Sequence, residues 1–327
     1  MNKKVISIAS ILIVLIAAGS IAAICIGAKT ISLDTIWDSI FHFQEGNLDM
    51  QLVRDARIPR ALATIIVGAG LAIAGAAMQG VTRNPIAEPT IMGVTQGATL
   101  IAVIVIVSAM SSTLFGRTLA ALVGALGSGL LILVFSMQNA RNMSMSRFIL
   151  MGSALSSFFI SIATIIAMIF NRSWDIAFWV AGSFRVVTWS HVILLLFSII
   201  CIVILIFLSY RINIVNLGED IAIGLGENPS RVRMIVILVI IPICAISVSV
   251  AGNIAFVGLI VPHIIRRIFG NDYRLIIPFS MLGGAALVVI ADIAARMVNS
   301  PYETPIGLFT SLIGVPFFLY LVRKENG

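Results

Sequence analysis

The sequence predicts an all-α integral membrane protein of about ten transmembrane helices, with both ends of the chain in the cytoplasm. Hydrophobic residues make up 60% of its 327 residues and charged residues 11%, whereas a soluble domain has about 25% charged residues. The apolar residues stand in long runs, and a membrane helix needs roughly 20 of them. Basic residues gather at the ends of these runs, which is typical of membrane topology.

We expect ten membrane helices in one polytopic domain over residues 1–327, because the connections leave no room for a large soluble domain. The first apolar run follows Lys3 and Lys4. It is longer than the core of a secretory signal, which favours a retained span over a cleaved leader. The predicted segments are 5–27, 60–80, 91–110, 118–137, 147–170, 190–209, 234–250, 254–269, 275–297 and 306–322.

Two of the predicted connections are long and aromatic. Residues 28–59 are partly acidic, and Trp37, Phe41 and Phe43 within them suit a helix that lies at the membrane surface. Residues 171–189 contain tryptophans placed where aromatic rings favour the level of the lipid headgroups.

The distribution of basic residues sets the predicted orientation. With the amino terminus inside, thirteen of the 21 lysines and arginines lie on the inner side and the other eight lie outside. This bias predicts cytoplasmic termini. Eight basic residues on the outer side are many for a protein with this bias, however, so topology alone does not explain them.

Several spans are rich in small residues, notably 68–80, 123–129 and 283–296. Apolar burial drives no association between helices in lipid, and small residues let helix backbones approach closely. These faces therefore predict tight helix packing.

The composition excludes some functions. Lysine occurs only at Lys3, Lys4, Lys29 and Lys324, and a phosphate-binding Walker A loop requires a lysine beside its glycines. The chain therefore cannot hydrolyse ATP by that route. Its net charge of +7 comes from basic residues at span ends, which indicates the lipid bilayer rather than nucleic acid as its surroundings.

No cofactor or metal site is predicted, and the chain is not expected to be an enzyme. The cysteines lie inside apolar runs without paired spacing, which favours apolar filling. The histidines lie at unrelated span ends, so no nucleophile, base or ligand set converges, and the histidine next to a proline is expected to pack. The residues concerned are Cys25, Cys201, Cys244, His42, His191 and His263.

Between Ala251 and Arg274 a short apolar segment is interrupted by Gly258 and by the pair Pro262–His263, and it runs into two adjacent arginines. A broken helix is tolerated at membrane depth where neighbouring helices or a cavity satisfy its freed backbone groups. The segment therefore predicts helices that pack around a path rather than a simple anchor.

A polar insert, residues 211–233, falls on the predicted inner side. It is longer than the roughly four to six residues that a plain connection needs. It contains one helix-like piece around 219–225 and a second that begins at Asn228-Pro229-Ser230, an asparagine cap followed by proline in the first turn. The insert predicts a docking site for another protein.

Two further patterns place charge at span ends. Arg57-Ile-Pro-Arg60 opens the second span, and residues 78–89 (MQGVTRNPIAEP) close it with a turn that its prolines keep from being helical throughout. Asp292 and Arg296 are four residues apart and share one helix face. Such a pair marks either a functional site or a structural ion pair, and the sequence leaves both readings open.

These motifs together resemble the permease family of ABC importers for iron–siderophore complexes, haem and cobalamin. The resemblance covers nearly the whole chain, in order and with matching spacing. The segments that carry it are RIPRALATIIVGAGLAIAGAAMQGVTRNPIAEPTIMGVTQGA (57–98), WVAGSF with the later Trp189 (179–189), NLGEDIAIGLG (216–226), GNIAFVGLIVPHIIRRIFGNDYR (252–274), PFSMLGGAALVVIADIAAR (278–296) and ETPIGLFTSLIGVPFFLYL (303–321).

The resemblance implies the ten-span architecture of a type II ABC importer permease in the bacterial cell membrane. It implies a second permease subunit, identical or paralogous, around a central path. It also implies two copies of a cytoplasmic ATPase below and a substrate-binding protein outside. The expected cargo is an iron–siderophore complex carried into the cytoplasm, with haem or cobalamin as alternatives.

The resemblance also implies roles for particular residues. The coupling helices seated in the ATPase would involve Asn216, Leu217, Gly218, Glu219, Asp220, Gly224, Leu225 and Gly226. Arg57, Arg60 and Arg296 match outer-rim positions that meet acidic residues of the binding protein, although Arg57 and Arg60 could instead only mark the membrane boundary. The cytoplasmic gate would fall at Asn142, Met143, Ser144 and Met145.

An ion-coupled secondary transporter is the alternative from a different class. Such a protein needs carboxylates or a broken-helix ion site near the middle of the membrane. Only Asp292 lies well within the predicted spans, and Arg296 is available to pair with it.

Overall fold

The computed structural model is helical throughout the part of the chain that it describes, residues 3–27, 29–89, 93–108, 110, 113–137, 145–300 and 302–325, apart from the connecting loops. Ten helices coincide with the ten predicted spans. They are α1 (Lys3–Cys25), α4 (Ile58–Thr82), α5 (Val94–Val107), α6 (Leu114–Met137), α7 (Met145–Ile169), α9 (Trp189–Asn216), α11 (Pro229–Ala251), α12 (Val257–Phe269), α13 (Tyr273–Met297) and α14 (Ile306–Glu325).

Seven of these helices are long and apolar enough to cross a membrane, namely α1, α4, α6, α7, α9, α11 and α13. The other three are shorter, because α5 and the apolar part of α14 fall below that length and α12 has 13 residues. The membrane-spanning, all-α character that the composition predicts is confirmed.

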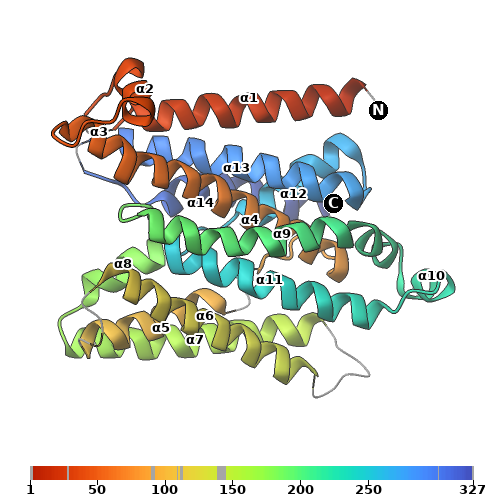
Figure 1. Cartoon of the computed structure of the whole chain (residues 1–327). Helices are drawn as coiled ribbons and strands as arrows, with labels where there is room; N and C mark the ends of the chain where they lie inside the picture. The colour runs from red at the N-terminus through yellow and green to blue at the C-terminus, as the bar shows by residue number, and fades with distance from the viewer. Residues whose placement is uncertain are drawn as a thin grey trace.

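The helices run side by side, and the shorter elements collect at the two ends of the bundle (Figure 1). One end carries α10 (Glu219–Gly224) and both marked ends of the chain. The opposite end carries α2 (Leu33–Phe41), α3 (Leu48–Leu52) and α8 (Ser173–Ala181). We call these the α10 end and the α2 end. Both termini lie at the α10 end, as the predicted topology requires.

The long connection at the α2 end is mostly helical. Helix α2 is capped by the Ser32 hydroxyl, which accepts from the Thr35 amide. Trp37 and Phe41 on it are exposed and stack with ring centroids 4.4 Å apart. Helix α3 continues through a π-helical turn, η1 (Val53–Arg57), directly into α4. The predicted surface helix is thus present, and the second span begins earlier than expected.

Helix α4 is the centre of the bundle. In its most apolar stretch 83% of the residues are buried, against 6% in α1. It packs against α9, α11, α12 and α13. A Cβ at Gly68 would overlap the Gly284 carbonyl of α13, and one at Gly75 would overlap Gly258 of α12. The small residues predicted to permit close packing therefore do so at these two crossings.

The sequence predicts a helix break at Gly258 and Pro262. In the structure the break lies earlier, between α11 and α12. The chain leaves helical geometry at residues 252–256, where Phe256 has a left-handed φ of 69°. Gly258 and Pro262 both lie inside α12 instead. Proline is therefore accommodated within the helix, which leaves one carbonyl of the preceding turn without its usual donor.

Candidate functional site

The polar insert forms a compact helical projection at the α10 end. Gly218, with φ of 131°, turns the chain out of α9, and the six-residue helix α10 follows. Gly226, at φ 83°, ends α10: its amide donates to the Ile223 carbonyl and the Glu227 amide to the Ala222 carbonyl, both at 2.9 Å. This pair of bonds is a Schellman motif, which requires a left-handed residue and so favours glycine.

The start of the next helix is as the sequence predicts. The Asn228 side chain accepts from the Arg231 amide at 3.1 Å, and Pro229 occupies the first turn of α11. The insert is shorter than predicted, however, because α9 continues to Asn216 and α11 already begins at Pro229. Only residues 217–228 stand outside the long helices.

Ion pairs hold this projection to the bundle. Arg233 of α11 pairs with Glu219 at 2.7 Å and donates through Nε to the Val81 carbonyl near the end of α4 at 3.0 Å. Arg211 of α9 lies 3.4 Å from Glu227. The α10 helix is therefore tied to α4, α9 and α11, and its movement would be transmitted to these helices.

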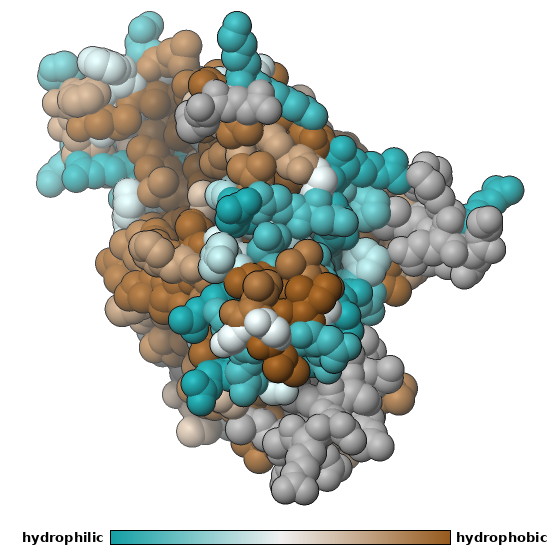
Figure 2. Space-filling view, turned by 90° about the vertical axis from the view of Figure 1, so that its right-hand side faces the viewer, coloured by the Kyte–Doolittle hydropathy of each residue, from teal (hydrophilic) through white to brown (hydrophobic). Residues whose placement is uncertain are grey.

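The outer surface of the projection is apolar. We define the α10 patch as Leu217, Ile221, Ile223 and Leu225, whose exposed fractions lie between 53% and 63%. Figure 2, which faces the α10 end, shows a compact hydrophobic area surrounded by hydrophilic residues. Apolar patches with a polar rim are typical of surfaces that contact another molecule. Ile221 and Ile223 lie within the expected coupling segment 216–226, although they were not among the eight residues named for it.

A buried polar network continues from this end into the bundle. Gln79 of α4 donates to the Gly258 carbonyl at 3.1 Å and accepts from Arg266 of α12 at 2.8 Å. Arg266 also donates to the Tyr273 hydroxyl of α13 at 3.0 Å. Gly258 is the residue whose carbonyl Pro262 leaves without a backbone donor. Sequence reasoning singled out Gly258, Pro262 and the arginine pair that includes Arg266, but it missed Gln79 and Tyr273. A proline inside a span is the signal that another group can take the place of the missing donor.

A second hydrogen bond between a side chain and the backbone of α12 lies at the start of this helix. Glu88, within the predicted non-helical turn after α4, accepts from the Phe256 amide at 2.5 Å. A carboxylate beside the amino-terminal end of a helix is favoured by the free amides and by the helix dipole. The turn thus fixes where α12 begins, a role that its sequence did not reveal.

The three arginines expected to meet a binding protein come together at the α2 end, inside the chain. Asp292, almost fully buried, pairs with Arg60 at 2.9 Å and with Arg296 at 3.0 Å. Arg60 also pairs with Glu303 at 2.6 Å. The predicted ion pair between Asp292 and Arg296 is therefore present, and the contribution of Arg60 to it was not foreseen.

Arg57 and Arg296 also cap the end of α1. Arg57 donates to the carbonyls of Cys25, at 2.9 Å, and Lys29, while Arg296 donates to that of Ala23 at 2.9 Å. Cations at the carboxyl end of a helix satisfy its free carbonyls and oppose its dipole. Arg57 and Arg296 are each only 8% exposed. Their guanidinium groups are thus engaged within the chain rather than presented to the outside.

The expected gate residues cannot be placed in this arrangement. Asn142, Met143 and Ser144 lie outside the described residues, and Met145 is described only as the first residue of α7. The gate therefore stays a prediction. Among the residues that the structure covers, His, Cys, Asp and Glu side chains do not gather in threes as a metal site would require.

Comparison with known proteins gives consistent matches along the whole chain. A model of the FecCD transport family matches residues 12–324. The iron(3+)-hydroxamate import system permease protein FhuB of Bacillus subtilis is 43% identical over 313 residues, which is 95% of this chain and 82% of FhuB. The iron-uptake system permease protein FeuB of the same organism is 35% identical, over 95% of this chain and 94% of FeuB.

Solved structures agree with this assignment. An inward-facing transporter assigned to the metal-chelate type of ABC transporters superimposes with a TM-score of 0.83 at 30% identity, over 96% of this chain and 97% of that one. PsaBC of Streptococcus pneumoniae superimposes with a TM-score of 0.56 at 16% identity, over 88% and 95%, which shows a shared fold alone. By its sequence and its structure, the chain belongs to the FecCD transport family.

Proposed function

We propose that this chain is the membrane-spanning permease subunit of an ABC importer that carries ferric siderophore complexes into the cytoplasm. The α10 patch carries this proposal, because an exposed apolar surface beyond the spans is a seat for a partner that acts on the permease from the cytosol. The relatives support the cargo: FhuB is named for iron(3+)-hydroxamate and the 38% identical YfmD, also of Bacillus subtilis, for Fe(3+)-citrate. Both are permease proteins of import systems.

The partner at the α10 end is an ATPase of a separate chain. Its groove would have an apolar floor that receives Ile221 and Ile223 and a basic rim that faces Glu219 and Asp220, which both lie in the first turn of α10. The apolar contacts would provide most of the affinity, and the charges would orient the partner. The coupling residues expected from the sequence, from Asn216 to Gly226, all belong to this surface or its supporting turns.

Motion would pass from α10 to the spans through its ion pairs. When two ATPases close on ATP, a displaced α10 pulls on Arg233, which joins Glu219 to the Val81 carbonyl of α4. Helix α4 contacts α12 and α13 through Gln79 and its partners. A shift at α10 therefore reaches the helices around the central path without any energy source in this subunit.

At the other end we place the docking of a substrate-binding protein on the arginine cluster, defined as Arg57, Arg60, Arg296, Asp292 and Glu303. The cluster holds three cations and two carboxylates, so it has one positive charge in excess. Arg60 at its edge is shared with the more exposed Glu303. A carboxylate of the binding protein would displace Glu303 and take its place on Arg60. A second permease subunit, identical or paralogous, completes the path.

Reconstitution in lipid vesicles tests the proposal. Uptake of a ferric hydroxamate should require ATP inside the vesicle, the partner ATPase and the binding protein, and it should continue when ionophores collapse the ion gradients. Uptake driven by a proton gradient without the ATPase would instead support a secondary transporter. That alternative is disfavoured because Asp292, the carboxylate expected deepest in the spans, is held by two arginines and is not free to carry a proton.

A further inference from the structure

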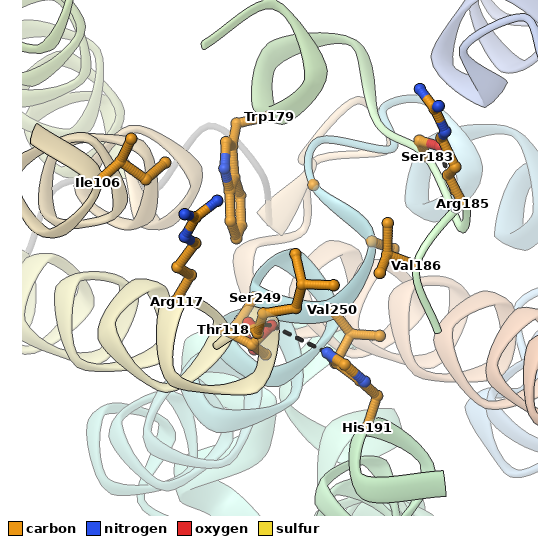
Figure 3. A pocket seen from close by; sticks show the side chains of 13 residues that line it. Ile106, Arg117, Thr118, Trp179, Ser183, Arg185, Val186, His191, Ser249 and Val250 are labelled. Carbon is orange, nitrogen blue, oxygen red and sulfur yellow. Dashed lines mark hydrogen bonds between the residues drawn. The ribbon is translucent and has the colours of Figure 1, made fainter. Parts of the chain in front are cut away.

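A cavity of about 330 Å³ opens at the α2 end, and its lining residues belong neither to the α10 patch nor to the arginine cluster. Its walls come from the starts of α6 and α9, the ends of α5, α8 and α11, and the loop between α8 and α9 (Figure 3). Small-molecule sites occupy about 300–1,000 Å³, so the cavity is large enough for a polar headgroup and several carbons. Its polar and aromatic lining comprises Arg117, Thr118, Trp179, Ser183, Arg185, His191 and Ser249.

The walls are well fixed. The Ser183 amide donates to the Ala251 carbonyl at 2.8 Å, and the Asn253 amide donates to the Trp179 carbonyl at 2.9 Å. These bonds join the loop and α8 to the end of α11. The cavity is therefore enclosed by elements that are hydrogen-bonded to one another, as a preformed site requires.

His191 contributes no charge to this cavity. The Thr188 amide donates to its Nδ1 at 3.2 Å, so Nδ1 is an acceptor and carries no proton. Nε2 then bears the hydrogen and donates to the Thr118 hydroxyl at 3.1 Å. The ring is neutral, and its two nitrogens are occupied by the protein.

The cavity is consequently cationic. Two arginines line it, and none of its lining residues is an aspartate or glutamate. The Nε of Arg117 is shielded from water and has no hydrogen-bond partner among the described residues. Figure 3 shows its guanidinium group beside the Trp179 ring. A shielded guanidinium N–H is costly unless an acceptor is present, and the cavity is the space in which an acceptor can lie.

We propose that this cavity binds an oxyanion, the phosphate or carboxylate group of a ligand with an apolar portion, and that Arg117 holds it. Arg185 at the rim adds a second positive charge, while Trp179, Ile106 and Val250 provide apolar contact. A tryptophan at this end of the spans lies at headgroup level. The oxyanion can come from an anionic phospholipid of the outer leaflet or from a soluble carboxylate or phosphate, and both have the same chemistry.

The test uses the full chain purified in detergent, with two ligand arms. In the first arm, native mass spectrometry measures the binding of added phosphatidylglycerol. In the second, thermal unfolding is followed with citrate or glycerol phosphate. The wild type is compared with Arg117→Gln and with the control Arg54→Gln, which removes an exposed arginine that lies over the Phe43 ring, outside the cavity.

We expect Arg117→Gln to weaken binding by about tenfold or more in one arm, because a charge-assisted hydrogen bond is lost, while Arg54→Gln binds like the wild type. Dependence on Arg117 in the lipid arm identifies a headgroup site, and dependence in the soluble arm identifies a small-molecule site. Equal binding by Arg117→Gln and the wild type in both arms overturns the proposal.

A second pair of variants tests anion binding in the cavity if Arg117→Gln does not fold. Val186 lines the cavity and is 44% exposed, so a polar residue is tolerated there. Val186→Glu places a negative charge at the rim and should repel the ligand, whereas Val186→Gln keeps the shape without the charge. If the two variants bind the anion equally well, the proposal fails.

Discussion

The side-chain amide of Gln79 donates a hydrogen bond of 3.1 Å to the carbonyl oxygen of Gly258, 179 residues later in the chain. That carbonyl would accept from residue 262 in a regular helix, but residue 262 is a proline without an N–H. Backbone groups at membrane depth must be satisfied by the protein. The two helices are therefore joined at the point where α12 cannot satisfy itself.

This relationship predicts coupling between Gln79 and Pro262. Gln79→Leu should lower the free energy of unfolding by about 1–3 kcal/mol, because it leaves a buried carbonyl without a donor. In a Pro262→Ala background the backbone N–H is restored, so the same Gln79→Leu change should cost clearly less. Thermal or denaturant unfolding of the four proteins of this cycle in detergent measures the difference. The same cost in both backgrounds would show that Gln79 does not serve as the replacement donor.

The α10 patch predicts a loss of coupling without a loss of folding. Ile221→Ser and Ile223→Ser should each reduce binding of the partner ATPase by about tenfold, since truncating an interface anchor costs about 1–2 kcal/mol or more. Co-purification with the ATPase and ATP-dependent uptake in vesicles provide the measurements.

The matched control for these variants is Ile40→Ser in α2. Ile40 is 56% exposed, comparable to Ile221 and Ile223, but it lies at the α2 end. We expect it to leave ATPase binding unchanged. If Ile40→Ser lowers ATPase binding as much as Ile221→Ser does, the α10 patch is not the specific seat of the ATPase. Exposure to lipid rather than a partner would then explain its apolar surface.

Asp292 is expected to be the most sensitive position of the arginine cluster. Asp292→Asn leaves Arg60 and Arg296 buried beside a neutral amide, and breaking a buried ion pair in this way costs about 3–5 kcal/mol. The yield of folded protein and its melting temperature should both fall. Asp38→Asn serves as the control, because Asp38 lies on α2 with a side chain that is 47% exposed. A variant Asp292→Asn that melts with the wild type would show that the two arginines have other sufficient partners.

Competition for Arg60 separates a docking role from a structural one. Glu303→Gln removes the more exposed partner of Arg60, so it should strengthen the binding of the substrate-binding protein and increase its dependence on salt. Arg60→Gln should weaken that binding. Pull-down at low and high salt measures both. Docking that is indifferent to Arg60→Gln at low salt would restrict the cluster to its role of holding α1, α4 and α13 together.

The sequence by itself determined the membrane character, the order of the ten predicted spans and the position of the polar insert. The reason is that a run of apolar residues or a cap such as Asn228-Pro229 acts within its own segment, so its consequence is readable locally. The tertiary structure alone decided that Arg60 and Asp292, 232 residues apart, share one ion pair. It also decided that Gln79 completes the backbone of α12, and that Arg117 faces a cavity built from five helices and a loop. These features depend on which helices lie side by side. The local sequence around an arginine at a span end is the same whether its side chain faces solvent, a carboxylate or the end of another helix, so the sequence does not reveal its partner.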